Sequence, residues 1–220
     1  MLTPSQLVRQ DPRAARVLHR HNIEFCCEGG NETLETACDR RGLDVEDVLA
    51  EIEGQRMPEQ PDWSEAPLGD LVQHILATHH RPLDEELPRL QHLAATVRGA
   101  HPDHAVWLGK VQLTLDSIVQ ELLQHMPKEE NVLFPLILAG RGHVATMPME
   151  VMETEHRRLG ELLSALREVT DGFQAPADAC PTWQALWTGL DALTEDLHVH
   201  VHLEDHILFP RARVAPSARV

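Results

Sequence analysis

The sequence predicts an all-α protein: an up-down-up-down four-helix bundle over residues 67–213, preceded by a small helical domain over residues 1–55. Two observations predict this fold. In the long carboxyl-terminal part, apolar residues recur at alternating steps of three and four, the spacing of a helix face packed against other helices. Breaks that contain glycine or proline divide this part into four long segments. We therefore expect helices over residues 67–98, 103–139, 147–170 and 182–211.

The amino-terminal part predicts shorter helices. Thr3-Pro4 and Asp11-Pro12 each place a proline where a helix begins. Residues 44–53 form a last short helix after the break at Gly42. The polar, proline-rich segment 56–66 then predicts a linker between two domains.

The composition excludes several classes of function. Asp and Glu total 35 against 19 Lys and Arg, a net charge of −16, which does not suit the binding of nucleic-acid phosphates. No segment reaches the ~20 apolar residues of a membrane span. The amino terminus lacks the pattern of a secretion signal, and four cysteines with two adjacent do not indicate a disulfide framework. We expect a cytoplasmic protein that binds neither nucleic acid nor membrane.

Six polar residues occupy positions where the helical pattern demands a core residue. They are His80, His125, Glu129, His156, His200 and Glu204. In the second long helix, for example, the apolar stripe reaches Leu122 and continues through His125 and Glu129 to Val132. Burying a carboxylate costs several kcal/mol unless it is paired or bound to a cation. The six residues therefore require a common explanation.

The same six residues fall at one level of the predicted bundle. Each of the four histidines lies about 22 residues from the turn that it shares with a neighbouring helix, and equal distances from a turn give equal height. The pattern His-x-x-x-Glu-x-x-x-Leu-Phe-Pro at residues 125–135 recurs at residues 200–210. Each copy places a His and a Glu on one helix face, one turn apart. Two such faces can place two carboxylates between two metal ions.

The chemistry of these side chains favours iron, because imidazole with carboxylate suits iron better than a closed thiolate zinc site. We predict a non-haem centre of two iron ions bridged by the carboxylates and by an oxo or hydroxo group. A ferritin-like site would instead use Glu-x-x-His pairs, and Glu153/His156 and Glu195/His198 have that spacing. We reject this alternative because Glu195 and His198 lie off the apolar stripe of their helix.

The other histidines are assigned no ligand role. Ten are expected at the surface or around the ligands: His19, His21, His74, His79, His92, His104, His143, His198, His202 and His206. His101 lies in a turn, and at 1.5 Å per residue it is roughly 30 Å from the site, which excludes it. Pro127 falls between His125 and Glu129 and predicts a distortion of the helix there.

These motifs resemble a known family. The pattern His-x-x-x-Glu followed by Leu-Phe-Pro resembles the hemerythrin-like HHE domain, so the predicted bundle is hemerythrin-like. The segment Asn22 to Gly30 places Cys26-Cys27 ahead of that bundle. In this order the two elements resemble the repair-of-iron-centres family, the di-iron proteins of iron–sulfur cluster repair. Glu28 makes the segment one residue longer than the family's Cys-Cys-Gly-Gly.

The resemblance implies a protein that restores iron–sulfur clusters damaged by oxidative or nitrosative stress, by supplying iron to damaged iron–sulfur proteins. It also implies that the six residues named above are the ligands of the di-iron centre. Two other functions remain open: reduction of nitric oxide at that centre, and binding or sensing of oxygen or nitric oxide. Whether the chain acts as a monomer or as a homodimer is also open.

The cysteine pair discriminates among these functions. Cys26 and Cys27 are the candidate catalytic residues, as a dithiol for redox chemistry or iron handling, since a plain oxygen carrier has no use for them. The alternative is a turn with two ordinary thiols. Cys38 and Cys180 are expected to have no role.

Overall fold

The computed structural model describes residues 2–10, 13–23, 25, 32–54 and 62–214. Its regular elements are all helices, which confirms the predicted all-α fold. Cys26, Cys27 and residues 56–61 of the predicted linker lie outside the described residues. Within the described ranges, no helix combines the length and the apolar character needed to cross a membrane.

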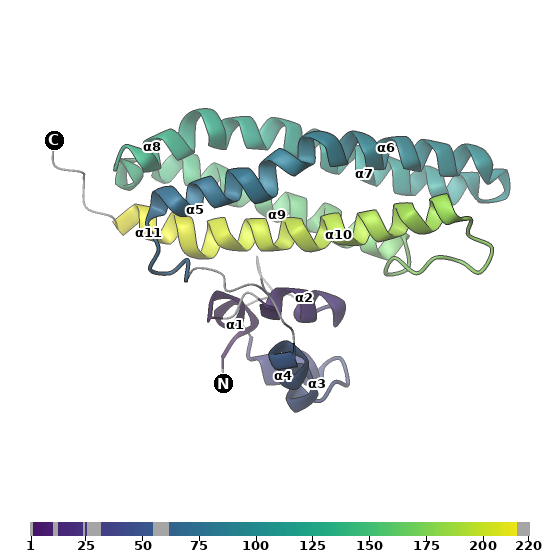
Figure 1. The fold of residues 1–220 in the computed structure, drawn as a ribbon, viewed down its shortest axis with the longest axis horizontal. Helices are drawn as coiled ribbons and strands as arrows, with labels where there is room; N and C mark the ends of the chain where they lie inside the picture. The colour runs from purple at the N-terminus through teal and green to yellow at the C-terminus, as the bar shows by residue number, and fades with distance from the viewer. Residues whose placement is uncertain (1, 11–12, 24, 26–31, 55–61, 215–220) are drawn as a thin grey trace. The chain divides into compact units, whose positions relative to one another are not determined.

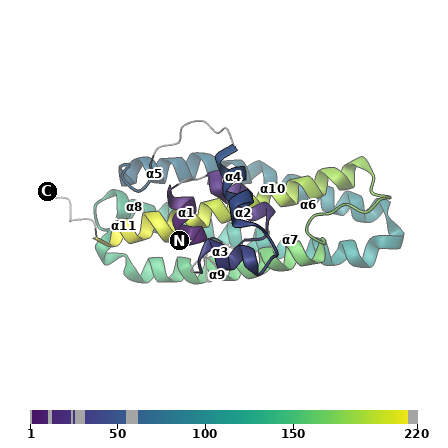
Figure 2. The same ribbon diagram turned by 90° about the horizontal axis from the view of Figure 1, so that it is seen from below.

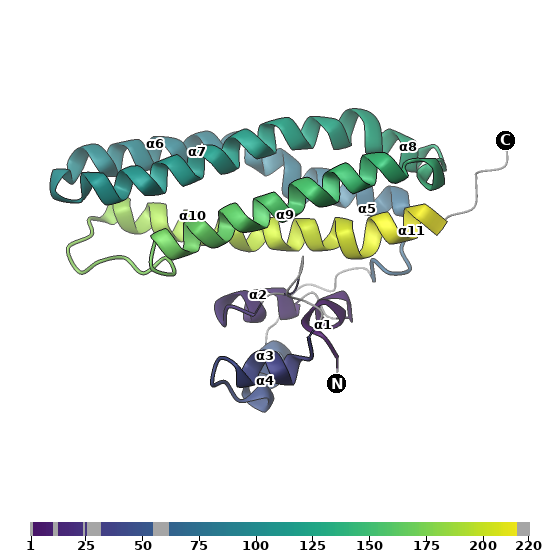
Figure 3. The same ribbon diagram turned by 180° about the vertical axis from the view of Figure 1, so that it is seen from behind.

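Four long helical segments form the up-down-up-down bundle (Figures 1 and 3). The first is α5 (Leu68–Ile75), η2 (Leu76–His80) and α6 (Arg81–Ala100); the second is α7 (Ala105–Lys128), η4 (Glu129–Leu133) and α8 (Phe134–Leu138); the third is α9 (Thr146–Val169); the fourth is α10 (Pro181–Leu203), η6 (Glu204–Leu208) and α11 (Phe209–Val214). Two short 3₁₀ helices, η3 (Pro102–His104) and η5 (Gly142–Val144), precede the second and third segments.

Contacts within the chain divide it into two compact units, and the predicted domain bounds stay a prediction. One unit comprises residues 74–135 and 147–196, with α6, α7 and most of α9 and α10. Its core is built from the apolar faces of these helices, and α9 shows the pattern most regularly. The buried residues of α9 are Met149, Met152, His156, Leu159, Leu163 and Leu166, which is the register that the helical spacing predicts.

The other unit comprises residues 1–73, 136–146 and 197–220. Its amino-terminal helices are α1 (Pro4–Gln10), α2 (Arg13–Arg20), α3 (Leu34–Asp39) and α4 (Val45–Gly54), which gather into a small cluster (Figure 2). Thr33 begins α3, because its side-chain oxygen accepts a hydrogen bond from the backbone N–H of Thr36. Phe25 is buried and its ring lies 5.9 Å from the rings of His198 and His202.

Three of the four long segments contain a single π-helical turn, at η2, η4 and η6. In each, the backbone N–H that follows the turn bonds to the carbonyl five residues earlier, and a proline comes next. These prolines are Pro82, Pro135 and Pro210. A proline inside a helix has no N–H to donate and crowds the carbonyl four residues before it. A wider turn ahead of the proline relieves that crowding, which explains why the turns fall where they do.

The π turns change which residues face the core. The sequence pattern placed Val132 on the apolar stripe of the second segment, and this is wrong: Val132 is 50% exposed and Leu133 is 1% exposed. The turn at η4 adds one residue to the helix, so every later position moves round by one. Pro127 does not end α7, and the distortion begins two residues later at η4.

A close approach at Gly142 gives a test of this packing. A Cβ atom at Gly142 would lie 2.5 Å from the carbonyl oxygen of Ala212 in α11, and this backbone oxygen cannot move aside as a flexible side chain could. We expect Gly142→Ala to lower the free energy of unfolding by about 1–3 kcal/mol, the usual range for overpacking.

The matched control is Gly99→Ala near the end of α6, where a Cβ meets nothing within 4 Å. This change should leave stability the same or raise it by about 1 kcal/mol or less, because alanine favours helix. Urea denaturation followed by circular dichroism compares the two variants. Equal stability in both would show that the approach at Gly142 is not tight.

Candidate metal centre

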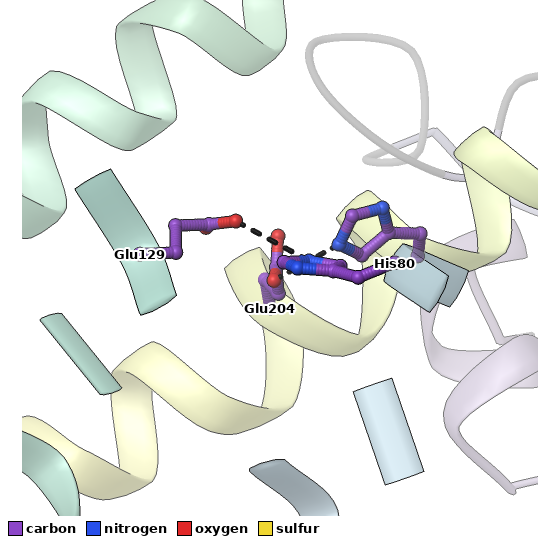
Figure 4. Close-up of side chains that lie close together, drawn as sticks. His80, Glu129 and Glu204 are labelled. Carbon is purple, nitrogen blue, oxygen red and sulfur yellow. Dashed lines mark hydrogen bonds and ion pairs between the residues drawn. The ribbon is translucent and has the colours of Figure 1, made fainter. Parts of the chain in front are cut away.

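The structure brings all six predicted ligand residues together in two overlapping groups. One group is His80, Glu129, His200 and Glu204, and the other is His125, Glu129, His156 and Glu204. In each group the candidate ligand atoms lie within 4.8 Å of one another. The six side chains are buried, and the most accessible of them, His125, is 4% exposed. His80, Glu129 and Glu204 point toward one another, each from a π-helical turn (Figure 4).

Glu129 is surrounded by imidazole nitrogens. Its Oε2 lies 3.3 Å from Nε2 of His125 and 3.5 Å from Nε2 of His80, and its Oε1 lies 4.0 Å from Nε2 of His156. The carboxylate is fully buried, and neither of its oxygens accepts a hydrogen bond from the described residues. A buried carboxylate with unsatisfied oxygens is costly unless a cation lies beside it.

The protons of two histidines are fixed by carboxylates on their outer side. Nδ1 of His80 lies 2.9 Å from Oε1 of Glu130, and Nδ1 of His125 lies 3.0 Å from Oε2 of Glu155. Because a carboxylate only accepts, each Nδ1 carries the proton and donates it. In a neutral ring Nε2 then holds the lone pair, and this atom faces Glu129. This carboxylate–histidine arrangement is the one that orients imidazole ligands toward a metal.

These contacts fit a metal ion better than a network of hydrogen bonds. When both rings are neutral, the Nε2 atoms of His80 and His125 and the oxygens of Glu129 are all acceptors, and acceptors that face one another at 3.3–3.5 Å repel. A cation among them would turn that repulsion into attraction. His156 and His200 add two further nitrogen atoms that could bind the metal. Nε2 of His156 lies 3.0 Å from Nε2 of His125, and Nε2 of His200 lies 3.1 Å from Oε1 of Glu204.

The outer carboxylates are themselves held by cations. Burial would raise the pKa of Glu130, but hydrogen bonds from Arg81, at 2.7 Å, and from His80 outweigh it and lower this pKa. Burial would likewise raise the pKa of Glu155, but hydrogen bonds from Lys128 and His125 lower it. Both carboxylates therefore stay charged to below their usual titration range and remain able to orient the histidines.

Sequence reasoning missed these two supporting residues. Glu130 follows the ligand candidate Glu129 directly, and Glu155 precedes His156 directly. Each therefore lies on one helix and supports a histidine from another. The signal available in the sequence for such a supporting residue was an acidic residue directly next to a predicted ligand. A one-dimensional pattern does not show which neighbouring helix that acidic residue reaches.

The structure also places several of the remaining histidines. His79 and His202 are buried, at 3% and 1% exposure, so the surface position, one of the two alternatives that the sequence left open for them, does not apply. Nδ1 of His79 lies 2.8 Å from Oδ1 of Asp196. Glu195 and His198, the rejected Glu-x-x-His pair, belong to neither ligand group. The side chain of His19 is outside the described part of the chain.

The fold and the buried His/Glu cluster together define a metal-binding four-helix protein, and comparison with known families agrees. Residues 71–212 match the family described as "Hemerythrin HHE cation binding domain". Residues 3–55 match ScdA_N, described as "Domain of Unknown function (DUF542)".

Curated relatives cover nearly the whole chain. It is 40% identical over 210 residues to the "Iron-sulfur cluster repair protein YtfE" of Enterobacter sp. (strain 638), covering 94% of each chain. It is 41% identical over 204 residues to the protein of that name from Musicola paradisiaca (strain Ech703), covering 91% of each. The protein of that name from Shigella boydii serotype 4 (strain Sb227) is 39% identical over 210 residues. The chain belongs to the YtfE family of iron–sulfur cluster repair proteins, as its motifs implied.

The outer carboxylates give the next prediction. Glu155→Gln removes the charged carboxylate that accepts the hydrogen bond from Nδ1–H of His125. We therefore expect the affinity for metal to fall about 10–100-fold, the usual cost of losing such a supporting residue. Competition for iron with a chelator at neutral pH measures the change. Because the pKa of Glu155 is lowered, this carboxylate is fully charged above the usual pKa range of a glutamate and then supports His125 completely. The support is lost only as the pH falls through the lowered pKa of Glu155.

The control for this prediction is Glu161→Gln, an exposed position on the same helix. It should compete for iron as the natural protein does. If Glu155→Gln released iron at the same chelator concentration as the control, Glu155 would have no part in holding the site.

Proposed function

We propose that this protein helps to restore iron–sulfur clusters damaged by oxidative or nitrosative stress, by supplying iron held at the buried His/Glu centre to damaged iron–sulfur proteins. The observation that carries the proposal is the similarity, over 94% of both chains, to a protein named for iron–sulfur cluster repair. The donor set supports it independently, because four imidazoles and two carboxylates suit iron.

The sharing of residues between the two ligand groups supports a centre for two iron ions. Glu129 and Glu204 belong to both groups, whereas each group has its own pair of histidines. We propose that one ion is held by His80 and His200, the other by His125 and His156, and that the two glutamates bridge them. Such a centre supplies open coordination positions and redox-active iron when it is loaded.

The protein's own residues prepare the site for this role. Glu130 and Glu155 hold His80 and His125 with their Nε2 lone pairs inward, so the site is ready for metal before metal arrives. Six neutral or anionic donors and no thiolate make a centre from which iron is released more easily than from a cysteine site. We further propose that Cys26 and Cys27 act as the dithiol that handles the released iron.

The ligand set is tested by iron content after anaerobic reconstitution with ferrous iron. We expect about two iron ions per chain in the natural protein, as in other di-iron bundles, and a fall to about one or fewer in Glu204→Ala, which removes a ligand of both groups. Metal analysis with a protein assay gives the ratio.

Glu195→Ala is the informative control, because Glu195 lies on the same helix and would be a ligand in the rejected Glu-x-x-His arrangement. It should keep its iron. Iron lost from Glu195→Ala and retained by Glu204→Ala would replace our ligand set with the ferritin-like one.

Repair itself is tested with an iron–sulfur dehydratase inactivated by nitric oxide. The nitric oxide is removed before the iron-loaded protein is added, so that its reduction cannot account for recovery. We expect the natural protein to restore activity and the double variant Cys26→Ser, Cys27→Ser to restore about ten-fold less, because serine hydroxyls are far weaker iron ligands than thiolates. The absorption spectrum of the iron centre should be the same in both.

Cys38→Ala is the control for this pair, since Cys38 is buried within α3, and it should repair normally. Equal repair by the double variant would remove the cysteines from the mechanism. Recovery only when nitric oxide is still present, with repeated formation of nitrous oxide under reductant, would instead favour the nitric oxide reductase alternative.

A further inference from the structure

Cys180 and His101 form a pair that the iron centre does not use. Nε2 of His101 lies 3.3 Å from Sγ of Cys180, within the reach of a hydrogen bond to sulfur. Residues 101 and 180 are 79 positions apart in the sequence, so only the antiparallel packing of the bundle brings them together. A nucleophile within hydrogen-bond reach of an imidazole is the arrangement that activates thiols. Both residues are partly exposed to solvent.

The position of Cys180 adds a second stabilising influence on its thiolate. Its carbonyl accepts the hydrogen bond from the backbone N–H of Gln184 at 3.0 Å, so Cys180 caps the start of α10, a helix of 23 residues. Its sulfur accepts hydrogen bonds from the backbone N–H groups of Trp183 and Thr182, in the first turn of a helix, where negative charge is favoured. The hydrogen bond from His101, with those backbone groups, lowers the pKa of Cys180 to about 7.

The surroundings of His101 hold its imidazole in place. His101 follows the last residue of α6, and its backbone N–H donates a hydrogen bond to the carbonyl of Val97 at 3.1 Å. Its ring meets the buried indole of Trp183 edge to face, with ring centres 4.8 Å apart. Two further titratable groups lie nearby, since Nε2 of His104 is 3.1 Å from Oδ2 of Asp178. The hydrogen bond from His104 lowers the pKa of Asp178, so this carboxylate has its own partner.

We propose that Cys180 is a redox-modification site, oxidised to a sulfenic acid by hydroperoxides with His101 as the proton carrier. The thiol proton passes from Sγ to Nε2 of His101, and the thiolate attacks one peroxide oxygen. The S–O bond forms as the O–O bond breaks, so sulfur loses two electrons and the peroxide gains them. The departing hydroxide or alkoxide takes the proton back from Nε2 and leaves as water or an alcohol.

Cys38 provides an internal comparison in the same chain. It is 1% exposed, and burial raises its pKa. A buried thiol with a raised pKa is inert, whereas a partly exposed thiol beside an imidazole is reactive. The two cysteines therefore predict opposite behaviour toward one reagent in one sample.

The experiment uses the iron-loaded full-length protein. Alkylation by iodoacetamide is followed by peptide mass spectrometry from pH 5 to 10 in the natural protein, in His101→Gln and in His92→Gln, an exposed control on α6, the helix that His101 follows. In the natural protein and the control, alkylation of Cys180 should rise with a midpoint near 7. In His101→Gln the midpoint should move toward the ordinary thiol value. At pH 7 the rate should fall by up to roughly six-fold, since a full return to the ordinary pKa of 9.0 would leave about fifty-fold less thiolate, partly offset by its higher nucleophilicity.

A pulse of hydrogen peroxide followed by dimedone then captures sulfenic acid. Dimedone should label Cys180 in the natural protein. In His101→Gln the rate of labelling should fall by about the same factor as the rate of alkylation. Cys180→Ser gives the background signal. Thermal melting by circular dichroism checks that the variants keep their fold. Any of three results would overturn the proposal. The first is an alkylation midpoint unchanged in His101→Gln, and the second is alkylation no faster at Cys180 than at Cys38. The third is peroxide oxidation that reaches both cysteines equally, which would point to radicals made at the iron.

Discussion

The rest of the bundle depends on two carboxylates that are fully buried. Glu129 and Glu204 are each 0% exposed, and a buried charge without compensation costs several kcal/mol. The four histidines surround these carboxylates, but two of them, when neutral, turn lone pairs and not protons toward Glu129. Proton donation alone therefore does not satisfy the centre. A metal cation resolves this constraint, and the helices must hold the six side chains near one point for it to do so.

The π-helical turns are the local means by which the helices reach that point. Glu129 and Glu204 each begin such a turn, and His80 ends one. In each case a proline two residues beyond the turn removes a backbone donor, so the departure from regular helix lies beside the site. The third helix, α9, contributes His156 without a π turn and keeps a regular register along its whole core face. Among the four long segments that the structure describes, π turns thus lie only where ligand residues converge.

Charge is organised in layers around the centre. The imidazoles of His80 and His125 face inward, and the carboxylates of Glu130 and Glu155 accept hydrogen bonds from their Nδ1–H groups. Arg81 and Lys128 in turn donate hydrogen bonds to those carboxylates from the solvent side. Each carboxylate lies on a different long helical segment from the histidine that it supports. The pair of Cys180 and His101 uses the same chemistry of a fixed imidazole in a more open setting, where the partner is a thiol and solvent has access.

The sequence by itself determined the all-α fold and picked out six residues that the structure brings together, because helical spacing and polar residues at core positions are local properties that survive in one dimension. Its motifs also indicated the family. It failed at Val132, where a π turn shifts the register, and it left open whether His79 and His202 are exposed or buried, because their burial depends on neighbouring helices. Tertiary structure alone decided which carboxylate supports which histidine and that His101 meets Cys180. Those partners lie 30 to 79 residues apart, and only the packing of one helix against another sets such contacts.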